Sequence, residues 1–212
     1  MPAQHKPSLS HSQASEIVKR LFGMTPSLLC PLPSYDDQNF YVLTVEGGKY
    51  ILKVMNSVDS KNPTLLEVQT HTMAFLHQQG LPVQTYLTLS PLWADCGFGC
   101  QKYLVRLLSY LPGTTISKVL VSPQLLYEVG KMAARMDKIL QEMQHPHLSV
   151  LQREKFMWNL SNVPLLESYV HLIDGDYVQE VVQSVIQQFK TFVLPKLSAF
   201  QSCTNPNPYC RY

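Results

Sequence analysis

A lysine inside an apolar run is the clearest candidate for binding chemistry in this sequence. Lys53 lies in the run YILKVM at positions 50–55. In a strand, alternation would place Ile51, Lys53 and Met55 on one face. Burying an ammonium group there costs free energy unless an anion pairs with it. A phosphate or a helix carboxylate would supply that anion, while an edge strand whose lysine reaches water explains the pattern equally well.

A short polar segment just before a strand is the second candidate. It comprises Ser34, Tyr35, Asp36, Asp37, Gln38 and Asn39. Small polar residues can offer backbone N–H groups and side-chain donors to phosphate oxygens. The same residue types favour ordinary turns for local reasons. Spacing alone therefore favours a turn over a phosphate loop.

Glu67 is the first acidic residue within the helix expected after residue 62. Its carboxylate could pair with Lys53, as the strand lysine and helix glutamate do in protein kinases. A helical wheel argues against this, because Glu67 lies nearly opposite the apolar stripe of that helix. The stripe consists of Leu65, Leu66, Val68, Met73, Phe75 and Leu76. The wheel favours a solvated surface acid.

Local signals predict the elements that must hold these candidates. Ser10 and Gln13 have capping-box spacing and Gly23 follows, which predicts a first helix over 10–23. The segment 26–33 is expected to be a connector. Two β-prone runs at 40–45 and 50–55 flank Gly47-Gly48 and predict a hairpin.

The next elements repeat this order. Asn62-Pro63 is a good N-cap with proline at the first helical position, so a helix is expected from there to about Gln79. The runs 86–92 and 103–110 predict a second strand pair. Leu111-Pro112-Gly113 then breaks the pattern and indicates a domain boundary.

Only helices are expected beyond the break. A helix over 123–143 carries a core-facing stripe, and a last helix over 177–200 carries a wide apolar face and a kink at Pro195. The stripe consists of Leu125, Val129, Met132, Met136, Ile139 and Met143. This order predicts an α+β fold of the protein-kinase type: a small antiparallel sheet with one helix, then a helical lobe.

Composition excludes several classes of protein. The 17 basic and 15 acidic residues leave a net charge of +2, which argues against a nucleic-acid or membrane-surface binder. No run of 18 apolar residues would span a membrane, and the polar N-terminus predicts no signal peptide. Five cysteines without a Cys-x-x-Cys pair predict a reducing, cytoplasmic location and no structural zinc.

Several strings resemble the aminoglycoside phosphotransferase and choline-kinase-like family over roughly residues 10–203. These are PLPSYDDQNF (31–40), YILKV (50–54), SKNP (60–63), YLVRLLSYLPG (103–113), VSPQLLYEVG (121–130) and FMWNLSNVPLLE (156–167). The resemblance implies a kinase that phosphorylates a small molecule, 5-hydroxy-L-lysine, with GTP (or ATP) and Mg²⁺ as cofactors. It implies an N-lobe over 1–110, a hinge over 111–122 and a partial helical C-lobe over 123–203.

The resemblance also implies roles for single residues. Residues 34–39 become the loop over the phosphates, Lys53 the lysine that contacts them, and Glu67 the helix partner of that lysine. Ser109, Tyr110 and Leu111 become the hinge against which the base lies. The resemblance therefore favours nucleotide binding by Lys53 and Glu67 over the alternatives of an edge-strand lysine and a solvated surface acid.

The family's catalytic loop and metal-binding aspartate have no counterpart in this sequence. After Glu180, 32 residues follow without Asp or Glu, and the tail over 204–212 does not resemble the family. We therefore expect no catalytic base and no metal ligand here, and a truncated, inactive form of the kinase. The alternative is a non-catalytic fragment that binds nucleotide or uses its exposed apolar helices to bind a protein partner.

Overall fold

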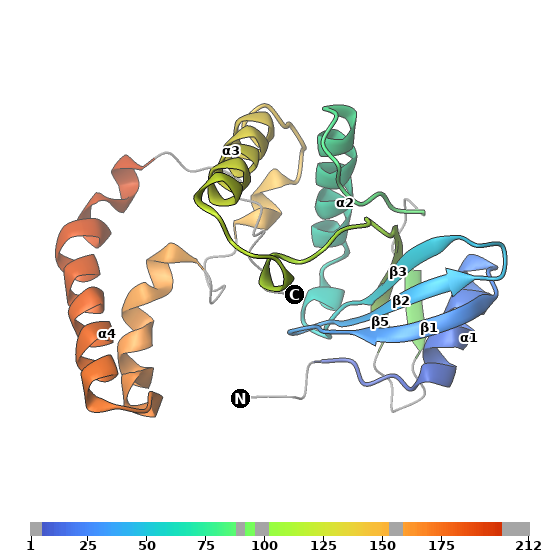
Figure 1. The fold of residues 1–212 in the computed structure, drawn as a ribbon, viewed down its shortest axis with the longest axis horizontal. Helices are drawn as coiled ribbons and strands as arrows, with labels where there is room; N and C mark the ends of the chain where they lie inside the picture. Colours follow the sequence, from blue (N-terminus) through green and yellow to red (C-terminus); the bar gives the residue numbers. More distant parts are fainter. Residues whose placement is uncertain (1–5, 88–91, 96–101, 153–158, 201–212) are drawn as a thin grey trace. The chain divides into compact units, whose positions relative to one another are not determined.

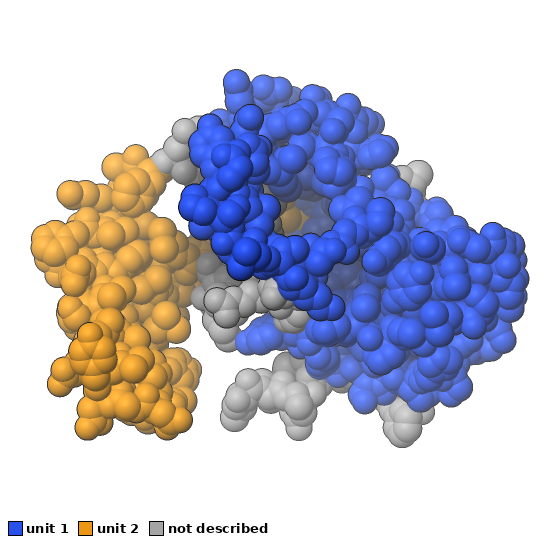
Figure 2. All heavy atoms as spheres, viewed as in Figure 1, with its two compact units in different colours: residues 1–148, 205–212 blue, residues 149–204 orange. Residues whose placement is uncertain are grey.

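A computed structural model describes residues 6–87, 92–95, 102–152 and 159–200. These residues form two compact units, one up to Leu148 and the other from Ser149 onward, shown in blue and orange in Figure 2. The tail predicted over 204–212 lies outside the described residues. The domain boundaries predicted from the sequence stay predictions.

The first unit contains a five-stranded antiparallel sheet in the order β1-β2-β3-β5-β4. The strands are β1 (Pro26–Leu32), β2 (Gln38–Thr44), β3 (Lys49–Val54), β4 (Leu92–Asp95) and β5 (Lys102–Ser109). The hairpin of β2 and β3 confirms the one predicted around Gly47-Gly48, and Gly47 adopts a left-handed φ of 83° in its turn. This φ favours glycine because a Cβ atom would clash with the backbone.

The segment 26–33 was expected to be a connector, and this is wrong. It forms strand β1, with Pro26 opposite Thr44 and Pro31 opposite Phe40. Proline removes a backbone donor and is therefore confined to edge strands and bulges. Strand β1 is at the edge of the sheet, where that missing donor costs little.

Of the second predicted strand pair, the run 103–110 matches β5, and the partner strand β4 begins at Leu92, where the predicted run 86–92 ends. Strand β4 pairs with β5 from Leu92 to Asp95, whereas Tyr86 forms a single bridge to Leu108. Both segments run along the same edge of β5. The residues between them, 88–91, lie outside the described part of the chain.

Helix α1 (His11–Phe22) covers one face of the sheet (Figure 1). The Ser10 side chain caps the Gln13 N–H, the Gln13 side chain caps the Ser10 N–H, and Gly23 ends the helix in the left-handed conformation, as predicted. Ala14, Ile17 and Val18 enter the main hydrophobic core with the sheet residues Leu29, Phe40, Val42, Leu52, Val54, Tyr103, Val105 and Leu107. This face of the sheet is therefore apolar.

The other face of the sheet is more polar and meets helix α2 (Pro63–Gln78) near one end. Leu66 of α2 packs with Met55 and Leu104. Asn62 caps α2 by accepting from the Leu65 N–H, which confirms the predicted start. By alternation, Lys53 and Arg106 lie on this face, because Met55 and Leu104 are two positions away from them.

Helix α3 (Pro123–Leu140) packs beside α2 in the same unit. Leu76 and Leu81 form a second hydrophobic cluster with Leu140 and Met143. The predicted stripe is partly confirmed: Met136 and Ile139 pack against this cluster, but Met132 is exposed.

The second unit pairs a long 3₁₀ segment (Leu160–Leu172) with helix α4 (Asp176–Gln188). Val170 and Ile186 are buried in it. The predicted last helix changes winding before Pro195: a π-helical turn spans Phe189–Val193 and a 3₁₀ turn spans Leu194–Ala199. Proline has no N–H and its ring clashes with the carbonyl four residues back, which explains the irregularity.

Candidate functional site

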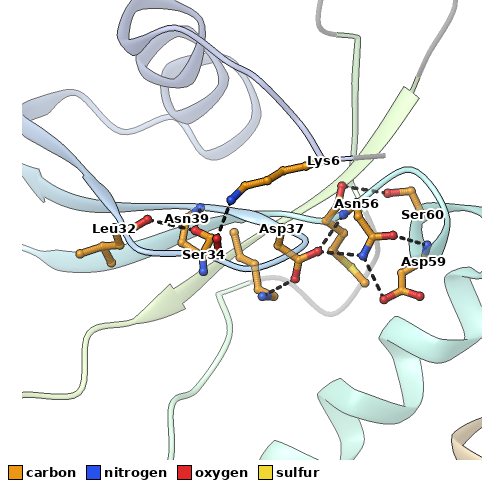
Figure 3. Close-up of polar contacts among 10 residues, drawn as sticks. Lys6, Leu32, Ser34, Asp37, Asn39, Asn56, Asp59 and Ser60 are labelled. Atoms are coloured by element: carbon orange, nitrogen blue, oxygen red, sulfur yellow. Dashed lines mark hydrogen bonds and ion pairs between the residues drawn. The ribbon is translucent and has the colours of Figure 1, made fainter. Parts of the chain in front are cut away.

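The loop between β1 and β2 brings Asp37 against Lys53 of β3. The Asp37 Oδ2 and Lys53 Nζ atoms lie 2.5 Å apart, and both side chains are largely shielded from water. Asp37 Oδ1 accepts from the backbone N–H of Asn56 at 2.8 Å and from its Nδ2 at 3.0 Å. Figure 3 shows Asp37 turned toward Asn56. The loop is thereby fixed to the end of β3.

The electrostatics of Asp37 follow from these contacts. Burial by itself would raise the pKa of the Asp37 carboxyl. The Lys53 ammonium and the hydrogen bonds from Lys53 and Asn56 outweigh burial and hold that pKa below its usual value of 3.8. Asp37 is therefore a carboxylate at neutral pH, and it neutralises Lys53.

Arg106 of β5 lies beside this ion pair. The strand register places Lys53 directly opposite Arg106 on one side and Asn39 on the other. Directly opposed residues have Cβ atoms about 4.5–5.5 Å apart and project from the same face. In the described part of the chain, the buried Nε and Nη1 atoms of Arg106 have no hydrogen-bond partner.

The charge of Arg106 is only partly balanced. Burial lowers the pKa of its guanidinium to about 10, and the Asp37 carboxylate opposes this shift. The group stays protonated at neutral pH. Together, Asp37, Lys53 and Arg106 make a cluster of two cations and one carboxylate, which we call the cation cluster. Such a cluster favours an additional anion.

Local hydrogen bonds fix the rest of the loop. The Ser34 hydroxyl donates to the Leu32 carbonyl at 3.0 Å and accepts from the Asn39 N–H at 3.0 Å. The Lys6 Nζ atom donates to the Ser34 carbonyl at 2.5 Å. These bonds fix the conformation of the loop locally, and a contact of residues 34–39 with phosphates stays a prediction. Asn39 Oδ1 is buried without a partner in the described part of the chain, beside the cation cluster.

Asn56 connects the cation cluster to the start of α2. Its Oδ1 atom accepts from the N–H groups of Val58 and Asp59 at 3.0 and 2.9 Å, and its Nδ2 atom donates to Asp59 Oδ2. Buried Ser60 then donates to the Met55 carbonyl and accepts from the Leu104 N–H at 3.0 Å. This network makes Asn56 a positioning residue for Asp37.

The predicted hinge lies at the end of β5. The Ser109 hydroxyl accepts from the Thr85 N–H at 2.8 Å, and the Tyr110 N–H donates to the Lys49 carbonyl at 3.1 Å. Tyr110 meets Tyr41 edge to face, with ring centroids 5.1 Å apart. Leu111 is exposed. Ser109 is opposite Tyr50, three positions along β3 from Lys53.

The structure brings some of the predicted residues together and leaves others apart. Asp37, Asn39 and Lys53 meet, while Tyr35 and Asp36 are exposed in the same loop. Glu67 is exposed on α2, and the described residues contain no ion pair between it and Lys53, whose carboxylate partner is Asp37. The role of Glu67 in nucleotide binding stays a prediction.

Sequence reasoning missed Arg106 and Asn56. Arg106 lies within the apolar run 104–108, where burial of its charge, like that of Lys53, costs free energy unless an anion pairs with it. Asn56 carries no comparable signal, because its role depends on the approach of a loop nineteen residues away.

The described residues do not fit a magnesium centre of their own. They contain no group of three His, Cys, Asp or Glu side chains that could hold a metal ion. The Asn39 oxygen is a single neutral ligand, whereas Mg²⁺ is bound through carboxylates and substrate phosphates. A search of the described residues also finds no helix long and apolar enough to cross a membrane.

Comparison with known proteins decides the family. Residues 29–197 match the APH family of phosphotransferase enzymes. The chain belongs to this family. This phosphotransferase-family chain is 57% identical to a hydroxylysine kinase of Danio rerio over 208 residues and 45% identical to a hydroxylysine kinase of Bos taurus over 213 residues. The alignments cover 95% and 94% of this chain but 59% and 57% of the relatives.

A solved structure shows the same fold. The amicoumacin kinase hAmiN in complex with AMP-PNP, Ca²⁺ and Ami matches 74% of this phosphotransferase-family chain and 52% of its own, with a TM-score of 0.53. The two sequences are 17% identical, so this likeness concerns the fold alone. It confirms the predicted kinase-like α+β architecture.

Proposed function

We propose that the whole protein transfers a phosphoryl group from Mg²⁺-bound GTP to the hydroxyl of 5-hydroxy-L-lysine, and that this chain supplies the nucleotide-binding sheet. The identity to relatives named hydroxylysine kinase supports the substrate. The preference for GTP over ATP in this proposal rests on the sequence resemblance. A cytoplasmic location follows from the cysteine pattern and is part of the same proposal.

The observation that carries this proposal is the cation cluster. Phosphoryl transfer depends mainly on positioning and on electrostatic stabilisation of the phosphates. Lys53 lies on the sheet face opposite α1, next to the β1–β2 loop. An incoming phosphate can displace the Asp37 carboxylate from the Lys53 ammonium, or bind that ammonium together with it. The excess positive charge of the cluster favours an anion there.

The predicted hinge, Ser109–Leu111, is a suitable place for the base of the nucleotide. Ser109 is tied to Thr85, and Tyr110 packs against Tyr41 on the same sheet face as Lys53. Three residues of a strand span about 10 Å. A base at Ser109–Leu111 would therefore leave room for a sugar before the phosphates reach Lys53.

Thermal unfolding with and without Mg²⁺·GTP tests nucleotide binding. At 100 times its dissociation constant, the nucleotide should stabilise the chain by roughly 2.7 kcal/mol. Lys53→Met should abolish this shift. Lys19→Met is the matched control, because Lys19 is an exposed lysine of α1, which covers the opposite face of the sheet. Equal shifts in the wild type and in Lys53→Met would contradict the proposed site.

A turnover assay tests the reaction. Hydroxylysine and lysine are offered in parallel with Mg²⁺·GTP or Mg²⁺·ATP, and the phosphorylated product is measured. Only hydroxylysine, which carries the acceptor hydroxyl, should yield product. Phosphorylated lysine would contradict the proposed substrate. So would the absence of phosphorylated hydroxylysine, with either nucleotide, from a protein as long as the relatives.

A second candidate function is binding without turnover. Apolar residues on α4 and the turn after it are exposed: Val181 by 45%, Val185 by 56% and Phe192 by 64%. Such a surface suits a protein partner. This candidate requires a chain that shifts its unfolding temperature with nucleotide yet yields no phosphorylated product, whereas turnover by the chain itself would exclude it.

A further inference from the structure

We propose that Arg106 is a second phosphate-binding residue, and that its guanidinium acts with the Lys53 ammonium on the phosphate chain of the nucleotide. This inference rests on the proposed function, because it concerns the same ligand and the same sheet face.

The geometry places the two cations side by side. Lys53 and Arg106 are opposed across the β3–β5 ladder and project from one face. The apolar core with α1 occupies the other face. The two head groups therefore point toward the same region, where Asp37 enters from the loop.

The hydrogen bonds show that the fold does not use this guanidinium fully. Asp37 gives one oxygen to Lys53 and the other to Asn56. In the described residues, Nε and Nη1 of Arg106 are buried and unpartnered. Burying a charged donor without a hydrogen bond lowers stability. An arginine that served only the fold would make these bonds.

The chemistry of the free donors selects the ligand. Nε and a terminal nitrogen of a guanidinium form a planar fork that matches two oxygens of a phosphate group. Lysine beside it acts as a point charge on the same or the next phosphate. Asn39, opposite Lys53 on β2, can add further donors to the phosphate. Rotating its side-chain amide would replace the unpartnered Oδ1 atom with two N–H donors.

Calorimetric titration of the chain tests the inference with three probes: Mg²⁺·GTP, guanosine and inorganic tripolyphosphate. Arg106→Met should weaken the binding of GTP and tripolyphosphate about 10- to 100-fold, the range of a lost charge-assisted hydrogen bond. It should leave guanosine binding unchanged. Arg106→Lys should bind GTP and tripolyphosphate with affinities between those of the wild type and of Arg106→Met. Arg20→Met, at an exposed arginine of α1, is the matched control and should bind like the wild type.

Unfolding temperature separates this role from a structural one. Because the buried donors have no partner, Arg106→Met should unfold at the wild-type temperature or above it. A variant that unfolds several degrees lower, or that binds GTP within twofold of the wild type, would overturn the inference. If Lys53→Met loses GTP binding while Arg106→Met keeps it, only this inference fails. A wild-type chain that binds neither GTP, ATP nor tripolyphosphate would overturn the proposed function as well.

Discussion

Replacing Asp37 with asparagine should destabilise the first unit measurably. The substitution keeps the size of the side chain and one carbonyl oxygen for the Asn56 N–H, but it removes the charge that faces Lys53. The side chains of Lys53 and Asp37 are 24% and 17% exposed. Arg106 also loses the carboxylate that offsets its burial. Two cations then remain without an anion.

The magnitude follows from this partial burial. Exposed ion pairs contribute about 0.2–1 kcal/mol, whereas removing one partner of a buried pair costs about 3–5 kcal/mol. We expect Asp37→Asn to lower the free energy of unfolding by about 2–3 kcal/mol. For a chain of this size, about 2–4 °C corresponds to each kcal/mol, so the unfolding temperature should fall by roughly 5–10 °C.

Chemical denaturation at pH 7 measures this loss, with Glu46→Gln in the exposed β2–β3 turn as the matched control. A double-mutant cycle isolates the pair. Adding Lys53→Met to Asp37→Asn should cost less than Lys53→Met costs in the wild type. A loss below about 0.5 kcal/mol, or additive losses, would refute the reasoning, because either outcome means that the ion pair does not stabilise the fold.

Three further predictions concern the same unit. The pKa of Asp37 is lowered in the fold, so its stabilisation should be full at neutral pH and should decline as pH falls below the unfolded value of 3.8; denaturation curves in which the difference between wild type and Asp37→Asn stays constant as pH falls through that value would contradict this. Ser60→Ala should cost about 1–3 kcal/mol, because the buried Leu104 N–H loses its acceptor, and hydrogen exchange at Leu104 should accelerate. Ser10→Ala should cost about 1 kcal/mol through loss of the α1 cap, measured by thermal unfolding, with the exposed Ser8→Ala just before the helix as its control.

Local chemistry made much of the fold predictable. The ends of α1 and α2 follow from Ser10, Gln13, Gly23 and Asn62, whose side chains or left-handed backbone satisfy groups within the same helix. The hairpin of β2 and β3 follows from its glycine turn in the same way. Each of these signals involves residues a few positions apart, so sequence spacing fixes their geometry.

Strand β1 could not be predicted from such signals. Pro26 and Pro31 read locally as a connector, and only their place at the edge of the sheet makes a strand acceptable. The same holds for the partner of Lys53. The family resemblance implied Glu67 of the next helix, while the loop before β2 brings Asp37 to Lys53 instead.

The sequence by itself determined the helix caps, the hairpin and the presence of a lysine within an apolar strand. Tertiary structure alone decided which charges meet. Arg106 is 53 residues from Lys53 and 69 from Asp37 along the chain, and the β3–β5 register and the β1–β2 loop place all three together. A charge at long sequence distance leaves no periodic signal, because its partner depends on strand order and register rather than on spacing.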